Sequence, residues 1–210
     1  MNAPLRFAFP KGRIAAPLAA LLGRPPLSIP PFEGRNLVVE VPDSGLYFLL
    51  LKDFDVPTYV RRGAADLGVA GSDVLWEKES DLPRPLDFPF GRCRFSLMRP
   101  ESASPPPEGR APRVATKYVK RTRDFFEARG ISADIVPLSG SVELAPRMNL
   151  ADYVADLVDT GETMRANGLV EVERICDVRP QLVVNRGALA RRRAELFGFI
   201  EVLAQMLSGT

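Results

Sequence analysis

The chain has 210 residues, of which 46% are hydrophobic and 26% are charged, enough for one large domain or two small lobes with a real core. Its 28 Lys and Arg nearly balance 26 Asp and Glu, and the net charge of +2 argues against a protein that binds nucleic acid mainly by neutralising phosphates. Histidine is absent, which excludes histidine triads, histidine metal sites and imidazole general bases. An enzyme of this composition has to work by positioning and by charge.

No segment of the sequence is typical of export or of insertion into a membrane. The most apolar run, residues 45–51, is too short to span a bilayer, and the N-terminus lacks the basic start and long apolar run of an export signal. Two cysteines, Cys93 and Cys176, make neither a disulfide framework nor a metal site, so we expect free thiols. These features predict a cytoplasmic protein with neither a membrane nor a nucleic acid as its partner.

Proline and glycine divide the first half of the chain into alternating strands and helices. The expected elements are a strand at 5–9, a helix at 14–22, a β-rich run at 37–41, a short helix from 56 to 60 and a buried strand at 65–71. Ser72 and Asp73 follow that last strand and are natural helix caps.

The second half repeats this alternation after a proline-rich solvent loop at 101–109. The expected elements are strands at 113–115 and 134–138, helices at 119–128 and 150–158, a β-like run at 170–172 and a final helix at 188–207 with the arginines 191–193 on its wet side. The pattern predicts an α/β protein with largely parallel sheets. We place one lobe at 1–91 plus 181–210 and the other at 92–180, joined near 93–98 and 176–184.

The segment 139–163 has the densest set of candidate functional residues. Positions 150, 153, 154, 157 and 158 are apolar at helical spacing, which predicts the buried stripe of a helix. Asp152, Asp156 and Asp159 then line a different face, where like charges repel and no Lys or Arg of the helix offsets them. Carboxylates that point towards a Thr-Gly turn indicate a site for a hydroxylated or cationic ligand.

The turn itself suits an anion. If Thr160 caps a following short helix, the amides of residues 161–164 point outward, and Gly161 lets a phosphate approach the backbone. Carboxylates for sugar hydroxyls beside amides for a phosphate fit a ribose 5-phosphate. The same residues also fit a plain helix stop followed by a capped restart, and spacing alone leaves both interpretations open.

Glu143 with the run 150–164 resembles the signature of the ATP phosphoribosyltransferase family, which carries out the first step of histidine biosynthesis. Other segments are similar to family motifs in the same order: 9–13, 55–60, 63–73, 114–118 with 125–126, and 166–169. The resemblance covers nearly the whole chain. It departs at Asn149, where the family usually has glycine, and at Lys52, where an arginine is common.

The resemblance implies a two-lobe type II periplasmic-binding-protein-like fold with a central cleft and two connecting strands. It implies that N1 of the adenine of ATP attacks C1 of 5-phosphoribosyl 1-pyrophosphate and displaces pyrophosphate, with Mg²⁺ carried by the substrate pyrophosphate. Because the chain has no C-terminal histidine-sensing domain, it resembles the short form. That form implies a homodimer unit in a hetero-oligomer with a histidyl-tRNA-synthetase-like regulatory subunit.

The resemblance also implies roles for particular residues. The 5-phosphate would bind at Asp159, Thr160, Gly161, Glu162 and Thr163. The ribose hydroxyls would bind Glu143 and Asp156, with Asp152 in reserve. The remaining candidates for pyrophosphate or ATP are Lys11, Arg13, Lys52, Asp73, Lys117 and Tyr118.

Several of these residues also have a purely structural interpretation. Lys11 and Arg13 fit a capped helix start with solvated charges, Asp73 fits a helix cap, and Lys117 with Tyr118 fits a basic helix start beside a half-buried ring. We expect Phe125 and Phe126 to be core.

Three other kinds of protein fit parts of this pattern. A non-catalytic two-lobe module for small anions, or the effector domain of a regulator, would share the fold. A nucleobase phosphoribosyltransferase would place two adjacent acids before Thr-Gly, whereas this chain has only Asp159 there.

Overall fold

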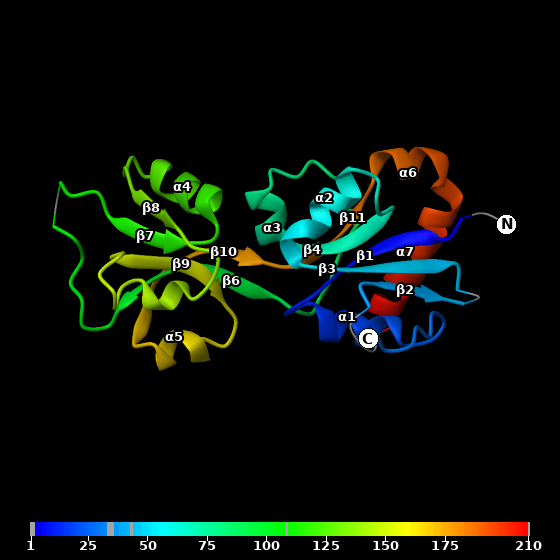
Figure 1. Ribbon diagram of the computed structural model, residues 1–210, viewed down its shortest axis with the longest axis horizontal. Coiled ribbons are helices and arrows are strands. Elements are labelled where there is room, and N and C mark those ends of the chain that lie inside the picture. The colour runs from blue at the N-terminus through cyan, green and yellow to red at the C-terminus, as the bar shows by residue number, and fades with distance from the viewer. Residues whose placement is uncertain (1–2, 33–35, 43, 108, 210) are drawn as a thin grey trace. The chain divides into compact units, whose positions relative to one another are not determined.

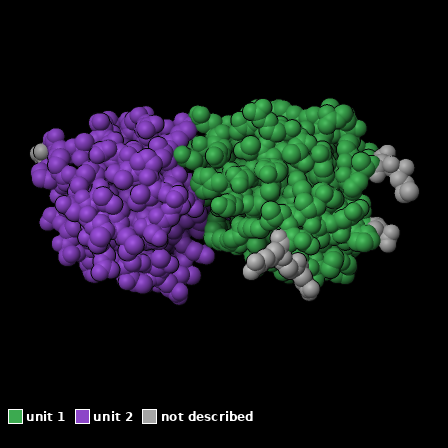
Figure 2. All heavy atoms as spheres, viewed as in Figure 1, with its two compact units in different colours: residues 1–91, 179–210 green, residues 92–178 purple. Residues whose placement is uncertain are grey.

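The computed structural model describes residues 3–32, 36–42, 44–107 and 109–209. The chain divides into two compact units, residues 1–91 with 179–210 and residues 92–178 (Figure 2). The second crossing therefore lies between Val178 and Arg179, just before the boundary expected from the sequence.

The first unit contains a six-stranded sheet in the order β2-β3-β1-β4-β11-β5 (Figure 1). Its strands are β1 (Leu5–Pro10), β2 (Val38–Val41), β3 (Leu46–Leu51), β4 (Leu67–Gly71), β5 (Leu86–Asp87) and β11 (Pro180–Val184). β1 runs parallel to β3 and β4, while β2, β11 and β5 pair antiparallel. The carboxyl ends of β1, β3 and β4 therefore share one edge, where candidate site residues follow them.

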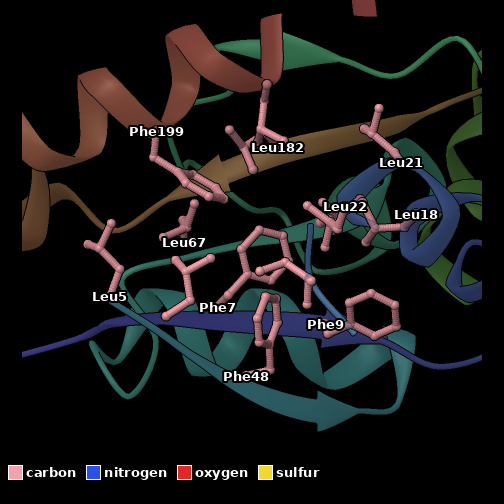
Figure 3. Packing of buried hydrophobic residues seen from close by; sticks show 14 of the residues in the cluster. Leu5, Phe7, Phe9, Leu18, Leu21, Leu22, Phe48, Leu67, Leu182 and Phe199 are labelled. Carbon is pink, nitrogen blue, oxygen red and sulfur yellow. The ribbon is translucent and has the colours of Figure 1, made fainter. Parts of the chain in front are cut away.

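Helices cover both faces of this sheet. They are α1 (Ala15–Leu22), α2 (Val56–Arg61), α3 (Ser72–Glu77), α6 (Arg186–Arg191) and α7 (Arg193–Ser208), with a 3-10 turn η1 at Asp53–Asp55. The alternation of β1 puts Phe7 and Phe9 on one face, where Phe7 packs against Phe48 (5.3 Å between ring centroids) and Phe199 (6.0 Å) (Figure 3). On the other face Ala8 packs with α2. A Cβ at Gly68 would lie 2.8 Å from that of Ala8, so β4 needs glycine there.

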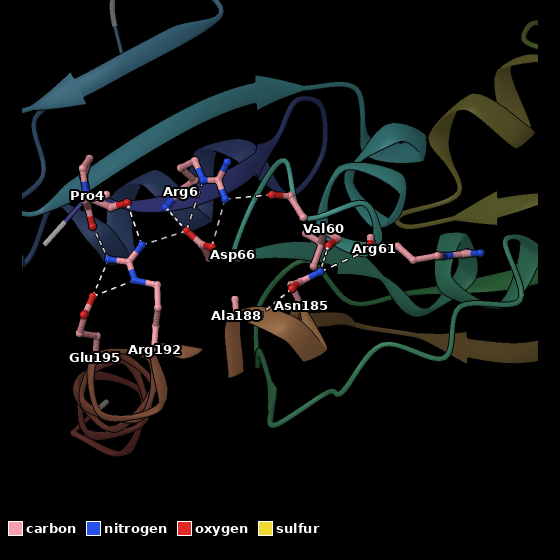
Figure 4. A network of polar contacts seen from close by, with 11 residues as sticks. Pro4, Arg6, Val60, Arg61, Asp66, Asn185, Ala188, Arg192 and Glu195 are labelled. Atoms are coloured by element: carbon pink, nitrogen blue, oxygen red, sulfur yellow. Dashed lines mark hydrogen bonds and ion pairs between the residues drawn. The ribbon is translucent and has the colours of Figure 1, made fainter. Parts of the chain in front are cut away.

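The expected final helix is two helices, which is a correction. Residue 192 leaves the helical region (φ −126°, ψ 34°) because its guanidinium reaches back to Asp66, 3.3 Å away, and to the carbonyl of Pro4 (Figure 4). Arg6 holds the same buried carboxylate through its amide (2.9 Å) and its guanidinium (3.3 Å). Arg192 is thus half-buried in a polar network around the buried Asp66, whereas Arg191 and Arg193 are exposed as expected. Asn185 caps α6 by accepting from the amide of Ala188.

The second unit contains a five-stranded sheet in the order β10-β6-β9-β7-β8. Its elements are β6 (Cys93–Pro100), β7 (Arg113–Thr116), α4 (Val119–Glu127), β8 (Asp134–Pro137), the 3-10 turn η2 (Val142–Leu144), β9 (Tyr153–Val158), α5 (Glu162–Ala166) and β10 (Leu169–Val178). β7, β8 and β9 are parallel, and β6 pairs antiparallel with β9 and β10. Phe125 and Phe126 are buried, as expected.

The predicted helix at 150–158 is wrong, because residues 153–158 form strand β9. This strand lies between β6 and β7, with Val154, Ala155 and Val158 buried. A strand buried on both faces is apolar at almost every position, so its residues also match a helical spacing by coincidence. The three aspartates therefore do not share a helix face.

None of the helices in the described chain combines the length and the apolarity needed to cross a bilayer.

Candidate functional site

In the first unit, two lysines follow neighbouring parallel strands at the carboxyl edge of the sheet. Pro10 pairs with Leu51 in register, so Lys11 and Lys52 leave adjacent strands, and the amide of Lys11 donates to the carbonyl of Leu51 (2.7 Å). Both lysine side chains are exposed. Two positively charged residues at adjacent strand ends make this edge favourable for an anion.

In the same unit, the side chains of Arg13 and Asp73 lie against neighbouring backbone. The half-buried Arg13 donates to the carbonyl of Gly91. Asp73 is buried in the first turn of α3, but the capping residue is Gly71, so the expected cap is wrong. The Asp73 carboxylate folds over Gly71, and a Cβ at Gly71 would meet its Oδ1 at 2.0 Å.

In the second unit, Glu143, Asp156 and the Thr-Gly loop line one pocket. Its volume is about 150 Å³, and its lining includes Glu143, Asp156 and the segment 157–164. Parallel pairing explains this, because the carboxyl ends of β8 and β9 lie at one edge, where η2 and the loop follow. Asp156 also accepts from the amide of Leu157 (2.8 Å).

The loop at 159–163 has a defined backbone conformation. Gly161 has a φ of +79°, which favours glycine, and it is the capping residue of α5, so the expected cap at Thr160 is wrong. The Thr160 hydroxyl instead accepts from the amide of Glu162 at 3.4 Å. Side chains hold two loop carbonyls: Arg94 donates to that of Asp159 and Arg165 to that of Thr160, each at 3.1 Å.

Asp152 does not belong to this pocket. It precedes the amino end of β9, and the six residues of that strand separate it from the loop by about 20 Å. Its carboxylate binds Arg110 (2.9 Å) and Arg113 (3.0 Å) and accepts from the amide of Arg113. Burial raises the pKa of Asp152, but these hydrogen bonds outweigh it and hold the pKa well below its ordinary value. Its expected reserve role at the ribose is therefore wrong.

This ion-pair cluster predicts a pH-dependent stability. We expect Asp152→Asn to lower the free energy of unfolding by about 2 kcal/mol at neutral pH, since it removes charged hydrogen bonds. Because the folded pKa is lowered, the wild-type carboxylate contributes fully above its unfolded pKa of about 3.9, and the contribution disappears as the pH falls towards the folded value. Urea unfolding from pH 7 downwards measures the difference between the two proteins. A difference that stays constant down to about pH 2 would contradict this assignment.

Lys117 and Tyr118 follow the carboxyl end of β7. Tyr118 is fully buried and packs edge-on against Phe95, with 5.2 Å between ring centroids, so the expected half-buried ring is wrong. The Lys117 ammonium lies 4.9 Å from the centre of that ring. The Tyr118 ring is thus part of the core, and only Lys117 of this pair remains a candidate for ligand binding.

Sequence reasoning missed Arg94, Ser96 and Glu171, which lie beside the loop. Arg94 and Glu171 form an ion pair with 2.7 Å between Nη2 and Oε2, although 77 positions separate them in the chain. Nothing in the spacing of the sequence indicates this pair, because only the pairing of β6 with β10 brings the two residues together.

The fold and this site define a class of protein: a two-lobe α/β protein of the type II periplasmic-binding-protein kind, with a pocket of carboxylates and a Thr-Gly loop. The periplasmic aliphatic sulphonate binding protein SsuA from Escherichia coli shares the fold, with a TM-score of 0.61 at 14% identity over 98% of this chain and 69% of that chain. The family model described as ATP phosphoribosyltransferase matches residues 52–209. The chain belongs to the ATP phosphoribosyltransferase family.

Relatives named ATP phosphoribosyltransferase match this chain over most of their own length. An ATP phosphoribosyltransferase of Anaeromyxobacter sp. (strain K) is 46% identical over 200 residues, 93% of this chain and 90% of the relative. The ATP phosphoribosyltransferase of Thermococcus gammatolerans is 46% identical over 183 residues, which cover 87% of this chain and 88% of the relative. Among solved structures, the ATP phosphoribosyl transferase (HisG:HisZ) complex from Thermotoga maritima matches with a TM-score of 0.86 at 33% identity, covering 98% of this chain and all of that one. The protein is thus a pentosyl transferase that condenses ATP with phosphoribosyl pyrophosphate, the first step of histidine biosynthesis.

Proposed function

We propose that the pocket of the second unit binds phosphoribosyl pyrophosphate. The loop of Asp159, Thr160, Gly161, Glu162 and Thr163 takes the 5-phosphate, and Glu143 and Asp156 take the ribose hydroxyls. The observation that carries the proposal is that both carboxylates and this loop line one pocket of about 150 Å³. A loop with glycine at positive φ suits close contact with a phosphate.

We propose that charge stabilisation, and not proton transfer by the protein, drives the reaction. N1 of adenine has a lone pair and forms the new bond to C1, while the bond from C1 to pyrophosphate breaks and its electron pair leaves with the pyrophosphate. Positive charge develops on the ribose, where the carboxylates of Glu143 and Asp156 stabilise it. Negative charge develops on the pyrophosphate, which suits the exposed Lys11 and Lys52. Arg13, Asp73 and Lys117, which follow β1, β4 and β7, are further candidates for contacts with pyrophosphate or ATP.

We propose that Mg²⁺ arrives bound to the pyrophosphate of the substrate, where it neutralises the leaving group. A histidyl-tRNA-synthetase-like regulatory subunit is the proposed partner, since the similar Thermotoga maritima protein is found in a HisG:HisZ complex. A homodimer is the proposed unit of that hetero-oligomer.

The test is a reaction of the purified chain with ATP, phosphoribosyl pyrophosphate and Mg²⁺, followed by mass spectrometry. We expect phosphoribosyl-ATP and pyrophosphate in equal amounts, and a higher rate when the regulatory subunit is added. If no product forms with or without that subunit, the proposed assignment of the pocket is wrong.

A further inference from the structure

The backbone of the Thr-Gly loop is tied to a polar cluster on the sheet behind it. Arg94 of β6 lies opposite Val158 of β9, the residue before the loop. Its Nη1 donates to the carbonyl of Asp159 at 3.1 Å, while Nε and Nη2 donate to both carboxylate oxygens of Glu171 at 2.7–3.0 Å. One guanidinium therefore connects the start of the loop to strand β10.

Glu171 is fixed by a third donor. The fully buried Ser96 hydroxyl donates to its Oε1 at 2.7 Å. The hydrogen bonds from Arg94 lower the pKa of Glu171 and raise that of Arg94, so both groups stay charged. The Arg94 side chain is 27% exposed, and its guanidinium contacts both Glu171 and the carbonyl of Asp159, so it has little freedom to move.

The cluster also reaches the other half of the pocket. Ser96 lies directly opposite Asp156 in the pairing of β6 with β9, on the same sheet face as Arg94 and Glu171. A register shift between Glu171 and Glu173 turns Glu173 to the opposite face, where it pairs with Arg129 instead. Because of this irregularity in β10, Glu171 lies on the sheet face of the pocket and Glu173 lies on the opposite face.

We propose that Arg94, held by Glu171 and Ser96, is a positioning residue that sets the conformation of the phosphate loop. This inference rests on the proposed function, because it assumes that the loop binds the 5-phosphate. Arg94 pulls the carbonyl of Asp159 towards the sheet, and this fixes the peptide planes whose amides follow in the loop. Its charge is largely neutralised by Glu171, so its effect comes from geometry more than from attraction of the substrate.

Arg94→Lys separates geometry from charge. Lysine keeps the positive charge and an ion pair with Glu171, but it lacks the planar fork that serves the carboxylate and the carbonyl together. The matched control is Arg129→Lys, which changes the exposed Arg129–Glu173 pair on the other face of the same strand. Both proteins are compared with wild type for binding of phosphoribosyl pyrophosphate by calorimetry and for amide hydrogen exchange at residues 159–163.

We expect Arg94→Lys to weaken binding of phosphoribosyl pyrophosphate about tenfold and to speed exchange in the loop, while Arg129→Lys changes neither. Glu171→Gln, which frees Arg94 from its charged partner, is expected to act in the same direction and serves as the second variant if Arg94→Lys does not fold. Unchanged affinity in Arg94→Lys overturns the inference, and so does weaker binding with unchanged loop exchange, since the loss would then not come from the conformation of the loop. If Gly161→Val also leaves binding intact, the proposed function fails; if only Gly161→Val weakens it, the positioning role alone fails.

Discussion

Gly161→Val is expected to reduce the affinity for phosphoribosyl pyrophosphate at least about 100-fold while the second unit stays folded. Gly161 has a φ of +79°, where a β-branched residue is strained, so the loop must change its backbone to accept valine. The nearest atom to an added Cβ is the end of the flexible Arg165 side chain, at 2.9 Å. The change therefore alters the loop and not the core behind it. Adding Thr160→Ala also removes the hydroxyl that accepts from the amide of Glu162.

Gly168→Val is the matched control for this variant. Gly168 also has a positive φ, +67°, and lies just beyond α5, with open space around an added Cβ. Both variants introduce the same strain, but only one introduces it in the loop. Calorimetry with phosphoribosyl pyrophosphate measures the affinity, and thermal unfolding measures the strain. Equal losses of affinity in the two proteins would mean that destabilisation, and not the loop, explains the effect.

The sequence predicted the local elements well wherever proline, glycine and periodicity agreed. The helix expected at 14–22 is α1 at Ala15–Leu22, and the helix expected at 119–128 is α4 at Val119–Glu127. Pro10 and Gly12 mark the start of α1. In α4, charged residues lie on one face, while Phe125 and Phe126 are buried on the other. In these segments the local chemistry and the tertiary environment favour the same structure.

The errors arose where tertiary pairing decides the structure. Strand β9 looked helical because a strand buried between β6 and β7 has no polar face to reveal its period. That error placed Asp152 beside Asp156, although the strand separates Asp152 from the pocket. The Asp152 carboxylate instead pairs with Arg110 and Arg113. The apolar run at 45–51, for which the sequence predicts no element, forms strand β3 (Leu46–Leu51) between β1 and β2.

The sequence predicted the residues that line the pocket more easily than the Arg94–Glu171 pair that holds the loop. Glu143, Asp156 and the Thr-Gly loop are close enough in the chain for a motif to contain them, and the structure brings them to one pocket. Arg94 lies on β6 and Glu171 on β10, both outside the sequence motif. Their contact depends on a register shift in β10. A local pattern contains no information about such a register.

Asp156→Asn is expected to lower kcat about 100-fold with little change in the KM for phosphoribosyl pyrophosphate. Asparagine keeps the shape of the side chain and an oxygen for the amide of Leu157, which Asp156 now binds at 2.8 Å. It also keeps an acceptor for a ribose hydroxyl, so binding of the substrate is largely retained. What it loses is the negative charge beside C1, and that charge matters most when the ribose becomes positive in the transition state.

Asp134→Asn is the control, because it makes the same chemical change on an exposed residue of β8 in the same sheet. Initial rates with each substrate varied in turn separate kcat from KM, and unfolding in urea checks that both variants are folded. We expect the control to match wild type. An Asp156→Asn enzyme with unchanged kcat and a raised KM would show that the carboxylate binds the ground-state hydroxyls only, since a group that stabilises the transition state must affect the rate at saturation. Stabilisation of the ribose cation would then have to come from another carboxylate that lines the pocket, such as Glu143.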